Sequence, residues 1–126
     1  MFKFRGFGVD SEQISLTIKA NFKLDIDTVI PLGLIINELI TNSIKYTFDN
    51  ENGGALSIEM VETDNTLIVS LRDSGKGMEL SDMEKVNSFG WKMIKSLSRK
   101  LKAEISIDSV SGTHVQLAIS RYKLVA

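Results

Sequence analysis

The chain has 126 residues, 43% of them hydrophobic and 25% charged, which is typical of one globular domain with its own core. Its 15 basic and 16 acidic residues give a formal net charge of −1, so nucleic acid and anionic lipid are not the expected partners. Cysteine is absent and no apolar run reaches the length of a membrane span. We expect a cytoplasmic domain, with any membrane anchor of a longer protein outside this sequence and no direct membrane contact here.

The first half of the chain predicts a strand and a long helix. Apolar residues alternate with polar ones over 14–19, as in a half-buried strand. Helical character runs from Thr28 to about Phe48, with candidate N-caps at 25–27 and with Pro31 expected in the first turn. The polar, glycine-containing stretch 49–54 is expected to end this helix.

A strand hairpin and a lid are predicted next. Alternating apolar residues over 56–60 and 67–71 indicate two strands, and 63–65 reads as the turn between them. The pattern then disappears over Glu79–Asn87, a polar segment that we expect to be a mobile lid.

The last part of the chain predicts a helix followed by two strands. Helical spacing returns over 91–101, and the strands at 105–107 and 115–119 are separated by a turn at 111–112. The basic residues around this helix are expected to form its solvated face: Lys92, Lys95, Arg99, Lys100 and Lys102. The whole order predicts an α+β fold, a two-layer α/β sandwich whose mixed, mostly antiparallel sheet is covered by helices on one face.

One helical face carries groups suited to a metal-bound polyphosphate. Glu38 and Asn42 are four residues apart and Lys45 is three further on, so a carboxylate, an amide and an ammonium share that face. Mg²⁺ prefers oxygen and takes few protein ligands when phosphates supply the rest, which makes Asn42 the candidate metal ligand. Lys45 would offset phosphate charge, and Tyr46 is either a wall of the nucleotide site or a core residue.

A second motif follows the strand at 67–71. Asp73 can accept a hydrogen bond from the exocyclic amine of adenine, whereas guanine presents a carbonyl at that edge. Gly75 and Gly77 allow the backbone to approach a flat ligand closely. Taken alone, a D-x-G-x-G segment after a strand is either an ordinary turn or part of a site for a flat ligand such as adenine.

A third segment, Ser88-Phe89-Gly90, opens the second helix. The N-terminal amides of a helix can bind phosphate oxygens without a charged side chain. We therefore expect these three residues to lie near the phosphates of the nucleotide.

From about Gln13 to Ser120 the chain resembles the ATP-binding catalytic domain of sensor histidine kinases, within the group that also holds the gyrase, Hsp90 and MutL ATPases. The phrase Ile30–Leu39 is most similar to kinases of the HWE and related types. The resemblance implies the Bergerat ATP-binding fold with ATP and Mg²⁺ as cofactors. It also implies that Glu38 acts as a base or polarising group and that Asn42 occupies the magnesium position.

The resemblance assigns further roles at the base. Asp73 would read adenine, Gly75 and Gly77 would flank it, and Thr113 would place a hydroxyl nearby. Ser88 departs from the commoner kinase pattern, in which a second glycine is frequent.

The phosphate acceptor is expected elsewhere. In these kinases the acceptor histidine lies on an upstream helical dimerisation domain, while His114 falls inside a strand and is expected to be structural. We expect residues 1–126 to form one domain, with 1–12 either a non-native leader or a linker from that upstream domain. A homodimer of the full-length protein and a response regulator receiver domain are the implied partners.

Other functions remain open at this point. An anti-sigma-factor-type serine kinase has the same ATP fold in a chain of similar length. A non-catalytic ATP-sensing module is disfavoured by Glu38, Asn42 and Asp73. A gyrase- or Hsp90-like ATPase is less expected, because those enzymes need a second domain to complete the site.

Overall fold

The computed structural model describes residues 2–3, 14–20, 23–44, 54–75, 88–109 and 112–125. Six strands and two helices are described in these ranges. In chain order they are β1 (Phe2–Lys3), β2 (Ile14–Lys19), α1 (Ile26–Asn42), β3 (Gly54–Thr63), β4 (Thr66–Asp73), α3 (Ser88–Lys100), β5 (Ala103–Asp108) and β6 (His114–Ile119).

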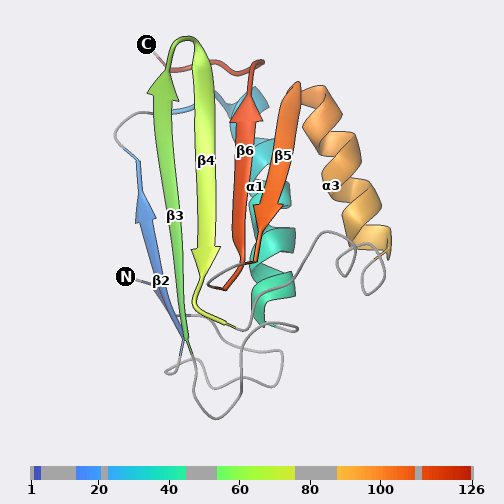
Figure 1. Ribbon diagram of the computed structural model, residues 1–126. Coiled ribbons are helices and arrows are strands. Elements are labelled where there is room, and N and C mark those ends of the chain that lie inside the picture. Colours follow the sequence, from blue (N-terminus) through green and yellow to red (C-terminus); the bar gives the residue numbers. More distant parts are fainter. Residues whose placement is uncertain are drawn as a thin grey trace.

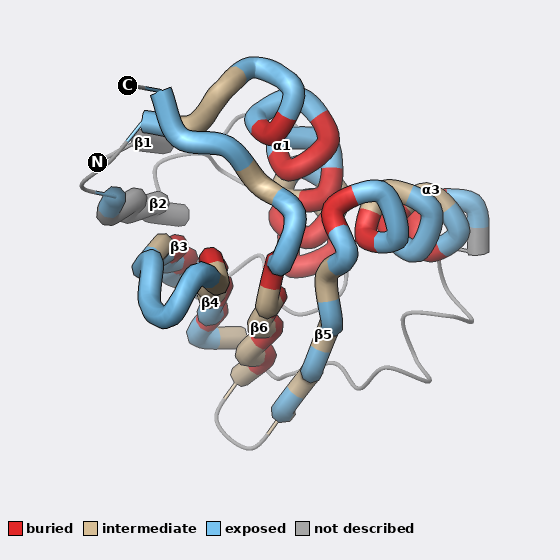
Figure 2. Tube along the Cα trace, turned by 90° about the horizontal axis from the view of Figure 1, so that it is seen from above, coloured by how far each residue is buried: buried red, intermediate tan, exposed pale blue. Residues whose placement is uncertain are grey.

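The strands form one sheet in the order β1-β2-β3-β4-β6-β5 (Figure 1). Only β2 and β3 pair in parallel among the described strands, and the other neighbours pair antiparallel. This parallel pair follows from the connection, because α1 crosses over the sheet between β2 and β3. Both helices lie on the same face of the sheet (Figure 2), so the predicted α+β two-layer sandwich is confirmed.

The core lies between the helices and the sheet. Alternate residues of β4 and β6 are buried, as expected for strands with one covered face. The buried hydrophobic residues of the described strands are Leu56, Ile58, Leu67, Val69, Leu71, Val115, Leu117 and Ile119, and those of the helices include Leu32, Ile35, Leu39 and Ile94.

Helix α1 begins earlier than predicted. Asp25 is its N-cap, and the Asp25 side chain accepts a hydrogen bond of 2.9 Å from the backbone N–H of Asp27. Pro31 therefore lies in the second turn rather than the first, where its missing N–H leaves one helical hydrogen bond unmade. The helix ends at Asn42 and continues as a short π-type turn at Ser43–Ile44. The predicted extension to Phe48 falls outside the described residues.

The β3–β4 hairpin confirms the predicted turn. Asp64 and Asn65 have φ values of 51° and 60°, as a two-residue turn of type I′ requires. Strand β1 was not predicted, and the predicted lid, Glu79–Asn87, lies outside the described residues. Within the described ranges, neither helix has the length and apolarity needed to cross a bilayer.

Candidate functional site

Four segments that carry predicted site residues meet at one end of the molecule. The C-terminal end of α1, the end of β4, the start of β6 and the N-terminal end of α3 all lie at the lower end in Figure 1. The antiparallel pairing of β4 with β6 accounts for part of this arrangement, because it brings Arg72 opposite His114 and so places Asp73 beside Thr113.

Asp73 is held by three hydrogen-bond donors. It is only 4% exposed, and its Oδ2 accepts a hydrogen bond of 2.8 Å from the Ser43 hydroxyl. Its Oδ1 accepts from the backbone N–H groups of Thr113, at 2.9 Å, and Gly75, at 3.1 Å. Hydrogen bonds to a carboxylate are stronger than neutral ones, so these three fix the orientation of the carboxylate.

Gly112 makes the close approach of β4 and β6 feasible. Its φ is +84°, and a Cβ there would lie 2.0 Å from the backbone oxygen of Asp73. The Asp73 N–H in turn donates to the carbonyl of Thr113 at 2.9 Å. Any side chain at position 112 would therefore displace the backbone that orients Asp73.

Thr113, whose backbone N–H donates to this carboxylate, also has a buried side-chain hydroxyl. Thr113 is 2% exposed, and its Oγ1 has no hydrogen-bond partner in the part of the chain that the structure describes. Burying an unpaired hydroxyl costs about 1–3 kcal/mol, so such a group is commonly satisfied by a ligand or water. A buried acceptor beside an unpaired hydroxyl suits the polar edge of a nucleobase such as adenine.

Ser74 fixes the turn after β4 to the start of β3. The Ser74 hydroxyl accepts from the Ala55 N–H at 2.9 Å, and the Ser74 N–H donates to the Ala55 carbonyl at 3.1 Å. Gly75, the next residue, is half-buried. The turn that carries Asp73 is thus anchored on both sides.

Glu38 and Asn42 lie one turn apart on α1, as predicted. Glu38 is half-buried, while Asn42 is 1% exposed at the last turn of the helix. An amide oxygen such as that of Asn42 is a suitable ligand for Mg²⁺. Among the described residues no group of three or more acidic, cysteine or histidine side chains is placed to hold a metal.

Helix α3 brings its N-terminus to the same end. Ser88 is its first residue and Gly90 is buried, whereas Phe89 is 80% exposed. The helix amides could therefore face a phosphate group, but the Phe89 side chain lies outside the buried part of the site. Three further predicted residues, Lys45, Tyr46 and Gly77, are outside the described residues.

Ser43 is the residue of this site that the sequence did not reveal. It is buried and orients Asp73 across 30 positions of sequence. The run of three consecutive polar residues, Thr41-Asn42-Ser43, at the end of an otherwise amphipathic helix was the available signal.

His114 follows Thr113 as the first residue of β6. Its Nε2 is buried without a hydrogen-bond partner among the described residues. Burial and the neighbouring charge of Arg72 lower the pKa of His114, while Asp108 opposes this shift. The imidazole is therefore biased towards its neutral form, as expected for a structural residue in a strand.

A family model matches most of the chain. Residues 27–125 match the family described as histidine kinase-, DNA gyrase B-, and HSP90-like ATPases. An anti-sigma F factor of Clostridium botulinum is 33% identical over 61 residues, which cover 48% of this chain and 41% of that protein. The chain therefore aligns with less than half of this relative.

Solved structures share the fold. The histidine kinase domain of the Erythrobacter litoralis EL346 blue-light activated histidine kinase superposes with a TM-score of 0.75 at 22% identity, covering 86% of this chain and 55% of that one. The Acinetobacter baumannii histidine kinase AdeS gives a TM-score of 0.64 at 20% identity, covering 85% and 53%. The chain thus belongs to the histidine kinase-, DNA gyrase B- and HSP90-like ATPases, a family of ATP-binding domains.

Proposed function

We propose that this chain is the ATP-binding catalytic domain of a sensor histidine kinase. In this function it transfers the γ-phosphoryl group of Mg-ATP to a histidine on a separate dimerisation domain, from which a response regulator receiver domain then takes it. The observation that carries the proposal is the Asp73 carboxylate, oriented by three donors beside the unpartnered hydroxyl of Thr113.

Adenine would be recognised at this carboxylate. Its exocyclic amine donates to Asp73, and Thr113 contributes a hydroxyl at the same polar edge. Guanine presents a carbonyl at the equivalent position, which the carboxylate repels. Gly75 and Gly77 would leave room for the flat base.

The phosphates would lie towards the helices. Asn42 supplies the protein ligand of Mg²⁺, Lys45 offsets phosphate charge, and the amides of the first turn of α3 face phosphate oxygens. The bound ion would neutralise charge on the phosphates. Glu38, one turn before Asn42, would act as a base or polarising group on the attacking histidine.

A serine kinase of the anti-sigma type is the second candidate. The relative at 33% identity is an anti-sigma F factor, and such a protein would use the same ATP site with a different acceptor. The similarity to histidine kinase structures extends over more of the chain, but at 20–22% identity it supports the fold alone and not the choice of acceptor. The nature of the acceptor amino acid separates the two proposals.

The test is a phosphoryl transfer assay with γ-labelled ATP and Mg²⁺. The full-length protein that contains this chain should become labelled, and the label should be acid-labile as phosphohistidine is. Glu38→Gln should retain ATP binding and lose most of the transfer, since it removes the basic group but keeps its shape. An acid-stable phosphoserine on a protein partner would favour the second candidate, and failure to bind ATP at all would contradict both.

A further inference from the structure

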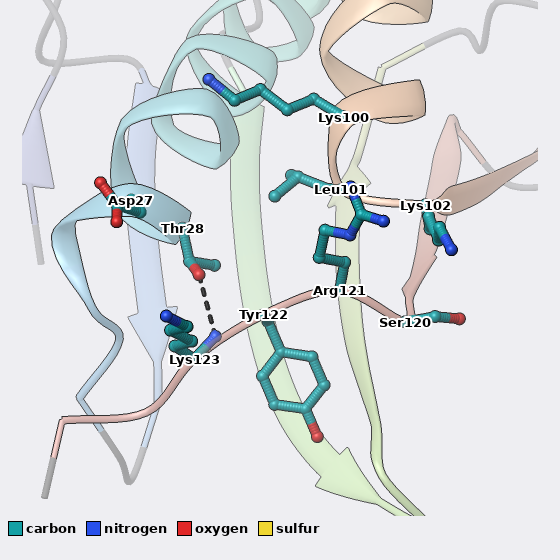
Figure 3. A pocket seen from close by; sticks show the side chains of 9 residues that line it. All are labelled: Asp27, Thr28, Lys100, Leu101, Lys102, Ser120, Arg121, Tyr122 and Lys123. Atoms are coloured by element: carbon teal, nitrogen blue, oxygen red, sulfur yellow. Dashed lines mark hydrogen bonds between the residues drawn. The ribbon is translucent and has the colours of Figure 1, made fainter.

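A hollow lies at the opposite end of the molecule from the candidate nucleotide site. It has a volume of about 560 Å³ and is bounded by the first turn of α1, the C-terminal end of α3 and the segment 120–123 that follows β6 (Figure 3). The nucleotide site instead involves the last turn of α1 and the first turn of α3. The two sites are therefore separated by the length of the helices.

The lining of this hollow is strongly basic. Lys100, Lys102, Arg121 and Lys123 line it, and Asp27 is the one carboxylate among its lining residues. Within the part of the chain that the structure describes, none of the four cations forms an ion pair. Like charges gathered in one concavity repel each other, and an anion bound there would relieve that repulsion.

Hydrogen bonds of the backbone N–H groups fix the segments that carry the basic residues. The Arg121 N–H donates to the Leu101 carbonyl at 3.0 Å, and the Ser120 N–H donates to the Lys102 carbonyl at 3.1 Å. On the other side, the Lys123 N–H donates to the Thr28 hydroxyl at 3.0 Å, the bond drawn in Figure 3. The three walls are thus joined before any ligand binds, which lowers the entropic cost of binding.

Lys102 occupies a position that usually favours glycine. It follows the C-terminal end of α3 with a φ of 47°, in the left-handed region. Cations at a helix C-terminus also interact favourably with the helix dipole, which accounts for Lys100. That explanation does not extend to Arg121 and Lys123, which come from another segment of the chain.

We propose that this hollow binds a small soluble polyanion that carries several phosphate groups. The arginine fork suits the paired oxygens of a phosphate, and lysines supply further point charges. The volume falls in the range of small-ligand pockets. An extended acidic peptide is the poorer fit. Its charged side chains on one face lie about 7 Å apart, whereas the phosphates of a polyphosphate lie close together. The hollow is also bounded by three segments of the chain, which suits a compact ligand better than an extended one.

The experiment uses the 126-residue chain, labelled for amide NMR and titrated with inorganic tripolyphosphate in buffer free of Mg²⁺. Tripolyphosphate should shift the amide signals of 101–102 and 120–123 in a saturable manner that weakens as salt is added. Arg121→Gln should weaken this binding at least five-fold. Lys95→Gln is the matched control, because it removes one exposed charge from α3 outside the hollow and should bind as the unmodified chain does.

Lys102→Gly separates a binding role from a structural one. Glycine relieves the left-handed backbone, so this variant should melt no lower than the unmodified chain and yet bind tripolyphosphate several-fold more weakly. Three results would overturn the proposal. These are equal binding by Lys102→Gly, Arg121→Gln and the unmodified chain, shifts confined to the nucleotide site at 73–75 and 112–113, and shifts at the hollow with a hexaglutamate peptide but none with tripolyphosphate.

Discussion

At the scale of single residues, the Asp73 carboxylate of the candidate site is oriented by hydrogen bonds within the protein. It accepts hydrogen bonds from Ser43, Gly75 and Thr113, so its orientation does not depend on a ligand. Such preorganisation reduces the ordering that ATP binding requires. A substitution that removes the carboxylate or one of its hydrogen-bond donors should therefore lower the affinity for ATP.

Asp73→Asn should weaken ATP binding by about 1.5–3 kcal/mol, roughly 10- to 150-fold, because it removes a charge-assisted acceptor from a buried position. Ser43→Ala should cause a smaller loss, since it removes one support and leaves the carboxylate. Calorimetric titration of both variants with ATP and GTP measures these effects, with thermal melting as the check on folding. Unchanged ATP affinity in Asp73→Asn would contradict the adenine role.

Gly112 and Gly33 provide a matched pair of glycine substitutions. Gly112→Ala should destabilise the fold by at least about 1–3 kcal/mol, because of its positive φ and the 2.0 Å approach to the Asp73 oxygen. Gly33 lies in α1 with nothing within 4 Å of its added Cβ, so Gly33→Ala should stabilise by about 0.5–1 kcal/mol. Urea unfolding measures both. A neutral Gly112→Ala would show that the turn can relax away from Asp73.

At the scale of elements, hydrophobic periodicity predicted the strands and helices but not their ends. Strands β3 and β4 extend beyond the predicted 56–60 and 67–71, because polar residues near the hairpin pair through backbone hydrogen bonds that leave no apolar pattern. Strand β1 has two residues, too few for any pattern. Periodicity reports burial of side chains, whereas the ends of strands depend on backbone pairing.

The residues of the two candidate sites were also predictable to different degrees, because local sequence patterns do not report contacts between distant segments. Asp73 stands in a local motif and Thr113 was implied by the family resemblance, so both could be proposed from sequence, while the Ser43 bond to Asp73 needs the folded topology. Lys100 and Lys102 are exposed, as the predicted solvated face requires. Their gathering with Arg121 around one hollow depends on where the chain passes after β6, which no local pattern encodes.

The segment after β6 is also joined to the hairpin. The Tyr122 hydroxyl donates to a Glu62 carboxylate oxygen of β3 at 2.5 Å, and this bond raises the pKa of Tyr122 to about 12. The unfolded chain loses the same proton near pH 10, about the ordinary tyrosine value. The stability that the bond contributes is therefore fully present below about pH 10 and is lost as the pH rises towards about 12.

Tyr122→Phe should lower the urea midpoint at about pH 8, where the phenol is protonated in both states. The difference between the variant and the unmodified chain should shrink as the pH approaches 12, because the unmodified chain then loses its hydrogen bond too. A difference that stays constant over this range would mean that Tyr122 contributes through packing alone.

At the scale of the whole molecule, α1 and α3 connect two ends with different chemistry. One end holds the Asp73 carboxylate and the unpaired Thr113 hydroxyl of the proposed nucleotide site, and the other gathers cations without ion pairs among the described residues. The described strands and helices lie between the two ends. Neither end presents an exposed histidine as acceptor within the described residues, since the only histidine of the chain is His114.

The isolated chain should accordingly bind Mg-ATP without labelling itself. His114 lies beside the site in sequence, but its backbone is paired in β6 opposite Arg72 and Asp108, and its Nε2 is buried. Phosphoryl transfer needs an acceptor held in line with the γ-phosphate, which a strand residue fixed on both sides cannot reach. Incubation with γ-labelled ATP should give the same background label in the unmodified chain and in His114→Gln. Strong label that disappears in His114→Gln would make His114 an acceptor and would remove the need for a separate histidine domain.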